Sequence, residues 1–398
     1  MGLSFASARL IMALYFVYSL VLSNWLIRIP DVQHALGLEP AGLALCLLGM
    51  PIGLVCSMVF SGPIVEALGP SRAIRYGFFG YALPLLLPGF AFTPWMLFVA
   101  LLLVGIGMGP LEVAMNVAAD RIGTSIGRTV MSRCHGFWSL GLMAGGVTGS
   151  AAATFGIAPG PHIALVTILV LAASQLLVLW LPMLGPSAPN PGGEKAPVFV
   201  LPPKNIVALC LFAFGMLLVE GAVTDWSAIY LRDVFGQSPP VTGFAFTAFG
   251  LMMAGGRLAG DWLSTRFGPV ALARVCCLVG LAGLLAMVLA TDPLMVVVGA
   301  AAAGFGVSIV FPLAVTAAAS RDGSPAVNVA ALSLLSFSGF MVGPPVIGFV
   351  AEAFGLRLGL ATLLLAAAMS LLLAGEVRVR PKREAETSTP LQSDRAAV

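Results

Sequence analysis

The chain has 398 residues, of which only 9% are charged, against roughly 25% in soluble proteins. Its mean hydropathy is +1.01, which excludes an ordinary soluble globular protein. The net charge of +3 comes from basic residues scattered over short loops, so nothing indicates a nucleic-acid partner.

The apolar segments reach about 18 residues and more without period-2 alternation, which predicts membrane-spanning helices and not the strands of a barrel. The predicted fold is an all-α membrane protein with 12 transmembrane helices in two six-helix pseudo-symmetric bundles. In chain order the predicted helices cover residues 10–28, 42–66, 74–90, 95–119, 134–156, 163–181, 206–230, 241–262, 271–290, 294–318, 327–352 and 356–375.

The two halves of the chain repeat each other 199 positions apart. Gly105 and Gly107 return as Gly304 and Gly306, and the loop after the second helix returns after the eighth. The first helices need a two-residue shift, which aligns 24–25 with 225–226. Repeats of this size in a membrane protein typically meet at a central site and rock about it, so the repeat predicts a transporter.

The halves are expected to form two bundles, residues 1–182 and 204–377. Between them, 183–203 is rich in Pro and Gly and predicts a flexible linker. The segment 378–398 is polar and of mixed charge, which predicts a disordered tail.

The orientation follows from Lys and Arg, which concentrate on the cytoplasmic side of membrane proteins. With the N-terminus inside, the outer side receives only Arg28, Arg232 and Arg357, and the other 17 of the 20 basic residues, Arg257 and Lys195 among them, fall on the inner side. Both termini are therefore expected to be cytoplasmic, in a multi-pass protein of the bacterial inner membrane.

Three carboxylates lie well inside predicted helices, where an ionisable group is costly and indicates function. Glu112 lies near the middle of the fourth helix with Asn116 one turn on. Glu220 and Asp225 lie in the seventh, where Thr224 shares the face of Glu220. A carboxyl in a low dielectric can change protonation near neutral pH, as a proton-coupling group must. The alternative for each of the three is an internal ion pair or a helix–helix hydrogen bond.

The start of the fifth helix combines Arg133, His135 and Trp138. The first two are near the cytoplasmic face, where a snorkelling arginine and a capping histidine are the alternatives to gating and substrate-binding roles. Trp138 is deeper, and an aromatic face beside polar groups suits the apolar face of a sugar ring, with plain packing as the alternative. Trp25 and Trp226, with Asn24 beside the first, occupy matching places in the two halves and are candidates for the same site.

Motifs of other function classes are absent from the sequence. There is no P-loop, no HExxH pattern and no GxSxG nucleophile elbow, and the six cysteines lack metal-ligand spacing. We therefore expect no cofactor, no metal and no enzymatic activity. A membrane-embedded enzyme or sensor would need a catalytic cluster or an output domain, and the sequence contains neither.

The two six-helix repeats and a basic loop between helices two and three resemble the major facilitator superfamily over essentially the whole chain. The loop motif of that family is similar to Gly62, Glu66, Gly69 and Arg72 here, which implies a gating role for these residues. Ala67 stands where the motif has a basic residue, and the copy in the second half has Thr265 in place of the acid.

Within the family, the fourth predicted helix resembles that of fucose-permease-like sugar:proton symporters, because the glycines of 105–107 are followed by Glu112 and Asn116. In those symporters a glutamate and an asparagine at this spacing line the cavity. The combination with His135, Trp138 and 220–227 is similar to a bacterial branch that includes the MosC and YbjJ proteins. The symporters have an aspartate in the first helix, where this chain has only Asn24, so the resemblance leaves open whether Asp225 or Glu220 replaces it.

The expected function is secondary transport of a small polar solute, such as a sugar or polyol, coupled to protons in a monomer by alternating access. The alternative is a proton-driven efflux pump. The antiporter motif GxxxGPxxG belongs on the fifth helix, but here only a similar pattern is found, on the eleventh, as Gly339, Gly343-Pro344 and Gly348, with the last glycine one position late.

Overall fold

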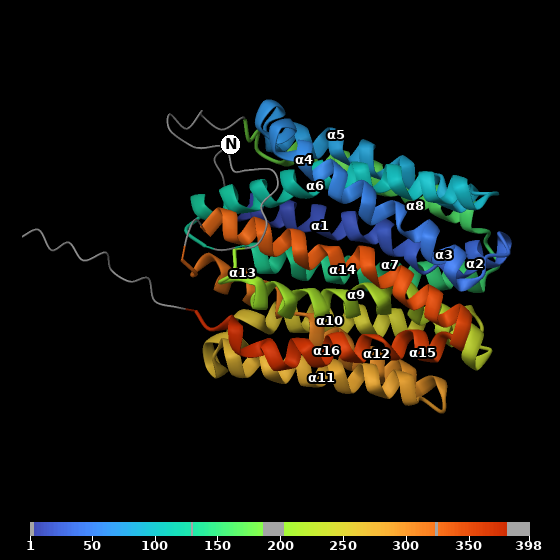
Figure 1. Ribbon diagram of the computed structural model, residues 1–398. Helices are drawn as coiled ribbons and strands as arrows, with labels where there is room; N and C mark the ends of the chain where they lie inside the picture. The colour runs from blue at the N-terminus through green and yellow to red at the C-terminus, as the bar shows by residue number, and fades with distance from the viewer. Residues whose placement is uncertain (1–3, 129, 186–202, 323–324, 380–398) are drawn as a thin grey trace, which may run out of the picture.

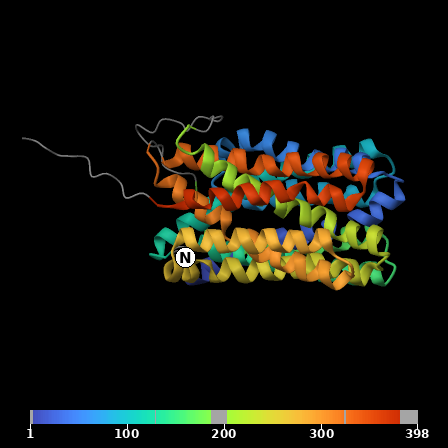
Figure 2. The ribbon, with the colours of Figure 1, turned by 60° about the horizontal axis from the view of Figure 1, so that its bottom comes forward.

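The computed structural model describes residues 4–128, 130–185, 203–322 and 325–379. The described chain is helical and forms twelve spans in two six-helix bundles (Figures 1 and 2). The spans of the first bundle are α1 (Phe5–Leu26) with α2 (Ile29–Ala35), α3 (Pro40–Leu47) with α4 (Gly49–Leu68), α5 (Pro70–Ala82) with the 3-10 turns η1 (Pro84–Leu86) and η2 (Pro88–Phe90), α6 (Pro94–Ser125), α7 (Met131–Thr154) and α8 (Pro159–Trp180).

The second bundle repeats this order with different breaks. Ten spans of the described chain are long and apolar enough to cross a membrane, judged by length and composition alone. The spans that contain α5 and α7 bring the number to twelve. The spans of the second bundle are α9 (Val207–Phe235), α10 (Pro239–Phe267), α11 (Pro269–Leu289), α12 (Pro293–Val307) with α13 (Val310–Ala319), α14 (Pro325–Phe354), and α15 (Leu356–Ala361) with α16 (Leu363–Leu373) and η3 (Ala374–Val377).

Prolines and polar breaks account for the largest departures from the predicted helix bounds. The helix predicted over 74–90 ends at Ala82, because Pro84 and Pro88 lack the N–H that would continue it. The helix predicted over 294–318 is interrupted between Val307 and Val310. By contrast, α6 and α9 run five to six residues beyond their predicted ends, which turns polar residues expected in loops into helical ones.

The backbone repeats with the same 199-residue period as the sequence. Gly69 and Gly268 end α4 and α10 with the same positive φ, 76° and 78°, a conformation that favours glycine. Thr93 and Asp292 cap α6 and α12, each accepting a hydrogen bond from the backbone N–H three residues on. The duplication therefore extends from the sequence to turns and caps.

The glycine stripe of α7 allows α1 to approach it closely. A Cβ added at Gly141 would meet the hydroxyl of Ser19, and one added at Gly145 would meet that of Ser23. The Ser19 hydroxyl donates to the carbonyl of Trp138, so each serine sits in the space that a glycine leaves. This packing fixes the rotation of α7 and the direction of Trp138.

Contacts between the two bundles are asymmetric along the helix axes. We call the end where α1 begins and η3 finishes the terminal end, and the other the distal end (Figure 1). At the distal end, Arg232 donates to the carbonyl of Pro30 and to Gln33, and Glu352 accepts from the N–H of Ala41.

At the terminal end, the hydrogen bond across the boundary in the described chain is an exposed one of 3.3 Å from Ser132 to Asp261. The distal end is therefore the more firmly closed.

The expected linker and tail are largely outside the described residues, which omit 186–202 and 380–398. The basic residues assigned there, Lys195, Arg380, Lys382, Arg383 and Arg395, are likewise outside them. At the start of the expected linker, the N–H of Leu184 donates to the Ser71 hydroxyl at 2.8 Å, and this bond holds Leu184 against α5.

Candidate functional site

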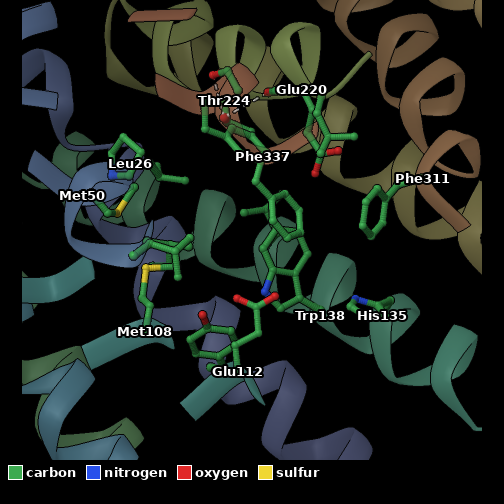
Figure 3. A pocket seen from close by; sticks show the side chains of 18 of the residues that line it. Leu26, Met50, Met108, Glu112, His135, Trp138, Glu220, Thr224, Phe311 and Phe337 are labelled. Atoms are coloured by element: carbon green, nitrogen blue, oxygen red, sulfur yellow. Dashed lines mark hydrogen bonds between the residues drawn. The ribbon is translucent and has the colours of Figure 1, made fainter. Parts of the chain in front are cut away.

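A cavity of about 350 Å³ lies between the two bundles, near the middle of the molecule. Helices α1, α3, α4, α6 and α7 line it from the first bundle, and α9, α10, α13 and α14 from the second (Figure 3). The first, fourth, seventh and tenth spans all contribute. The second, fifth, eighth and eleventh spans add to them.

Glu112 points into the cavity from α6, across from Glu220 and Thr224 on α9 (Figure 3). Among the described residues, Glu112 makes no hydrogen bond and no ion pair. It lies within electrostatic reach of the hydroxyls of Tyr15, Tyr18 and Tyr81. Its carboxyl is thus held in a mostly apolar wall without a counter-charge, which makes the charged form costly.

Asn116, one turn from Glu112, belongs to a small polar cluster on the same wall. Its Oδ1 accepts a hydrogen bond from the Tyr15 hydroxyl. The Tyr15 ring in turn meets the His135 ring edge-on, with 5.4 Å between centroids. The Asn116 amide nitrogen makes no hydrogen bond to the described residues, so it is free to donate to a bound molecule.

Arg257 is the central hydrogen-bonding residue of the opposite wall. It forms an ion pair with Glu220 (3.3 Å), and both side chains are about nine-tenths buried. Its other nitrogens donate to the Ser139 hydroxyl at 2.9 Å and to the carbonyl of Ser308 at 3.2 Å, where the break between α12 and α13 frees that carbonyl. The guanidinium also lies over the Trp138 ring, 5.5 Å from its centroid.

This arrangement corrects the placement of Arg257 on the cytoplasmic side. The residue is inside α10 and lines the cavity. The signal for it was in the sequence, since Arg257 falls within the helix predicted over 241–262, and the cost of an intramembrane charge applies to arginine as it does to carboxylates. Glu220 accordingly has the ion pair that was the alternative to its coupling role.

Asp225 lines the cavity from α9, closer to the distal end than Glu220. It makes no hydrogen bond or ion pair within the described part of the chain. Its neighbour Thr224 also lines the cavity but donates its hydroxyl to the carbonyls of Glu220 and Gly221, at 3.1 and 2.9 Å. The hydroxyl therefore gives its hydrogen to the helix and keeps only lone pairs for a ligand.

Two candidate residues point away from the cavity. Asn24 is fully buried, and its amide donates to the carbonyl of Leu20 and accepts from Thr148 on α7. Trp226 is also fully buried and is not part of the cavity wall, whereas Trp25 is. Asn24 therefore joins α1 to α7.

The 199-residue register also holds for the cavity wall, including the first helices, so the two-residue shift expected there is not needed. Glu112 corresponds to Phe311, and Asp225 corresponds to Leu26, all four lining the cavity. Each bundle thus supplies one free carboxyl where the other supplies an apolar side chain. Further lining pairs in the same register are Tyr18 and Leu217, Leu22 and Gly221, Trp25 and Thr224, Met58 and Arg257, and Trp138 and Phe337.

The expected gating residues lie at the terminal end, away from the cavity. Glu66, Arg72 and Arg133 are exposed, and none makes an ion pair within the described ranges. Gly69 provides the turn between α4 and α5, and a Cβ at Gly62 would meet nothing within 4 Å. Within the described part of the chain, the structure does not bring these residues together with a hydrogen-bond or ion-pair partner on the second bundle.

Residues that the sequence analysis did not select make up much of the wall. Tyr15 and Tyr18 carry no pattern that separates them from packing residues. The aromatic rings of Phe311, Phe337 and Phe340 form a stacked series on the second bundle, with centroids 5.2 and 6.2 Å apart. No group of three or more potential metal ligands occurs among the described residues.

Comparison with known proteins agrees with this architecture. The family model described as Major Facilitator Superfamily matches residues 11–331 and 227–398. An uncharacterised MFS-type transporter from Yersinia pestis is 31% identical over 364 residues, 89% of this chain and 92% of that protein.

Two further comparisons concern the relatives expected from the sequence. The membrane protein MosC of Rhizobium meliloti is 29% identical over 347 residues, 86% of this chain and 83% of that protein. The solved structure of the E. coli fucose:proton symporter FucP superimposes with a TM-score of 0.66, covering 93% of this chain and 98% of that one at 18% identity, which concerns the fold alone.

Proposed function

The chain belongs to the major facilitator superfamily and is a multi-pass membrane transporter, and from this premise we propose that it moves a small polar solute by proton-coupled alternating access. The solute class is a sugar, a polyol or a similar molecule, and the membrane is the bacterial inner membrane. The observation that carries the proposal is the free carboxyl of Glu112 in the wall of the central cavity.

The cavity suits a solute of this size. Ligand sites in proteins have volumes of roughly 300–1,000 Å³, and this one has about 350 Å³ between two bundles that can move relative to each other. Asn116 can donate to a solute hydroxyl, and Trp25, Trp138 and the other aromatic residues provide apolar faces. His135 and Thr224 border the same space.

Proton coupling follows from the cost of moving a bare charge. With Glu112 ionised, reorienting the solute-loaded carrier would carry an uncompensated charge through a low-dielectric region. Protonation removes that charge and allows the bundles to reorient. In this scheme Asp225 is the second candidate, since Glu220 already has Arg257 as its partner.

The closed distal end supports one state of the cycle. With the terminal end on the cytoplasmic side, as the distribution of basic residues predicts, contacts of Arg232 and Glu352 with the first bundle close the outer side. Glu66, Gly62, Gly69, Arg72 and Arg133 would then act at the inner side, where they would meet the second bundle when that side closes.

The alternative is export in exchange for protons. It is favoured by the stacked rings of Phe311, Phe337 and Phe340, which suit an apolar cargo better than a polyol. Solute uptake in right-side-out and inside-out vesicles separates the two, because a symporter accumulates solute on the side toward which protons flow and an exporter on the opposite side.

The test is Glu112→Gln in proteoliposomes, which keeps the shape of the protonated side chain. Wild-type protein should accumulate a solute when a proton gradient is imposed, and Glu112→Gln should bind and exchange it without accumulation. The matched control is Asp120→Asn on the exposed face of the same helix, which should behave as wild type. If Glu112→Gln still concentrates the solute, the coupling proton binds elsewhere.

A further inference from the structure

Tyr18 carries a buried hydroxyl that has no hydrogen-bond partner among the described residues. Its side chain is 3% exposed and lines the central cavity from α1. A phenol hydroxyl that is removed from water without a partner is destabilising, because it loses the hydrogen bonds that water would supply. Such an atom in a native structure calls for an explanation by the chemistry around it.

Contacts with α5 hold the Tyr18 ring in place. The ring meets that of Tyr81 edge-on, with 4.8 Å between centroids, and the Tyr81 hydroxyl donates to the backbone carbonyl of Tyr18 at 3.2 Å. Both side chains are almost completely buried. The Tyr18 hydroxyl is therefore fixed in position, and an acceptor has to come to it.

Glu112 on α6 supplies an acceptor that is free to do so. Its carboxyl lies within electrostatic reach of the Tyr18 hydroxyl, and α1 and α6 are in contact. No hydrogen bond or ion pair of the described structure holds this carboxyl away from Tyr18. Hydrogen bonds to a charged acceptor are about twice as strong as neutral ones. An unpartnered donor and an unpartnered acceptor thus lie on neighbouring helices of one bundle.

The two other tyrosines near Glu112 use their hydroxyls elsewhere. Tyr15 donates to Asn116 Oδ1, and Tyr81 donates to the carbonyl of Tyr18. A hydroxyl has one hydrogen to donate, so neither can bond to Glu112 without giving up its present bond. Within the described chain, Tyr18 is the tyrosine near Glu112 whose hydrogen is uncommitted.

The remaining polar groups of the cavity wall are less suited to this task. The Asn116 amide and the Trp138 ring N–H belong to half-buried residues, so water or a solute in the cavity can serve as their partner. The titratable and charged groups that line the cavity with Glu112 are Tyr15 and Tyr18 on α1, His135 on α7, Glu220 and Asp225 on α9, and Arg257 on α10. Arg257 is already paired with Glu220.

We propose that Tyr18 is a positioning residue for proton coupling, whose hydroxyl donates to the Glu112 carboxylate and sets the pH at which the carrier takes up and releases the coupling proton. This assignment rests on the proposed function, in which Glu112 binds that proton. A hydrogen bond to the ionised form stabilises that form and opposes protonation. Since α1 and α6 belong to the same bundle, the pair is kept when the two bundles move relative to each other.

The test measures the protonation of Glu112 in the purified protein, without a solute. Dicyclohexylcarbodiimide reacts with protonated carboxyls in apolar surroundings, and peptide mass spectrometry gives the labelled fraction at each site as a function of pH. Tyr18→Phe should raise the midpoint of Glu112 labelling by about one pH unit, a tenfold gain in proton affinity, because the carboxylate loses its donor. Asp225 is on the other bundle, so its midpoint should stay at the wild-type value.

Tyr15→Phe and Tyr81→Phe are the matched controls, since each removes a hydroxyl that is already bonded elsewhere. Each should shift the Glu112 midpoint much less than Tyr18→Phe does. At a pH where Glu112 is protonated, Tyr18→Phe should not lower the melting temperature, because the hydroxyl that it removes has no partner there. The infrared band of the protonated carboxyl, assigned with Glu112→Gln, gives the same midpoint without a reagent.

The proposal is overturned if Tyr18→Phe leaves the Glu112 midpoint unchanged or lowers it. It is equally overturned if the three tyrosine variants shift the midpoint alike, or if Asp225 shifts as far as Glu112, since either result would reflect a general change of polarity. Failure of the proposed function has a separate signature, the absence of proton-driven accumulation of any solute in proteoliposomes.

Discussion

The Arg257 guanidinium donates a hydrogen bond of 2.9 Å to the hydroxyl of Ser139, across the boundary between the two bundles. The same guanidinium neutralises Glu220 within its own bundle and lies over Trp138 on the other. Because Arg257 links the two bundles at the cavity, its contacts depend both on what occupies the cavity and on how the bundles are oriented. Rotation of one bundle must break the bond to Ser139, whereas the pair with Glu220 can persist.

Removing Arg257 is predicted to destabilise the protein by leaving Glu220 buried without a partner. Arg257→Met should cost about 3–5 kcal/mol, the range for breaking a buried ion pair. The double variant Arg257→Met, Glu220→Gln should recover much of this loss, because no uncompensated charge remains. Thermal unfolding of the two single variants and the double variant gives the coupling energy. Additive losses would show that the two side chains do not form a stabilising pair.

Asn116 and Trp138 are predicted to contact the solute directly. Asn116→Ala or Trp138→Ala should weaken binding by roughly 1–3 kcal/mol through a lost hydrogen bond or ring contact. Asn24 was expected to act in the same way, but its side chain bonds to Thr148. Asn24→Ala should therefore lower the melting temperature more than the affinity. Calorimetric binding with an identified ligand decides, and unchanged affinity in the first two variants removes them from the site.

A crosslink at the distal end is predicted to stop transport without unfolding the protein. Gln33 and Arg232 are hydrogen-bonded at 2.7 Å, so cysteines there should be bridged by a short bifunctional thiol reagent. Cys56 is first replaced by alanine, since it is the exposed one of the six free cysteines. Bridged protein should still bind solute from the terminal end. Normal transport by the bridged carrier would contradict alternating access by relative motion of the bundles.

Neighbouring glycines on α10 are predicted to differ sharply in their tolerance of alanine. A Cβ at Gly256 would meet the Ser308 side chain, whereas one at Gly255 would meet nothing within 4 Å. Gly256→Ala should destabilise by about 1–3 kcal/mol through overpacking, and Gly255→Ala should be neutral or stabilising. Thermal unfolding compares the two directly. Equal effects would show that α10 does not depend on this close approach.

The close contact between Gly256 and Ser308 has a counterpart in the first bundle, where the glycine and the serine have exchanged helices. There a Cβ at Gly109 on α6 would meet the Ser57 hydroxyl on α4, and the 199-residue register maps Ser57 onto Gly256 and Gly109 onto Ser308. The same helix contact is thus built twice, with the serine on opposite helices. In the second bundle the glycine lets Arg257 reach the carbonyl of Ser308.

The sequence by itself determined the solvent, the twelve spans, the duplication and the position of Glu112 and Asp225 inside membrane-spanning helices. These follow from local properties, because a long apolar run forces a helix in lipid and any carboxyl near its middle is then within the membrane. The bounds of the predicted helix at 74–90 were wrong where Pro84 and Pro88 ended it early.

Only the tertiary structure decided which polar residues face the cavity and which are paired. Asn24 and Trp25 are neighbours in sequence, yet the rotation of α1 against the glycines of α7 turns one into the helix contact and the other into the cavity wall. Glu220 and Asp225 are both intramembrane acids on α9, but Arg257 reaches only the first. Helical periodicity fixes which residues share a face, whereas the partner that meets that face depends on the packing of helices far apart in the chain.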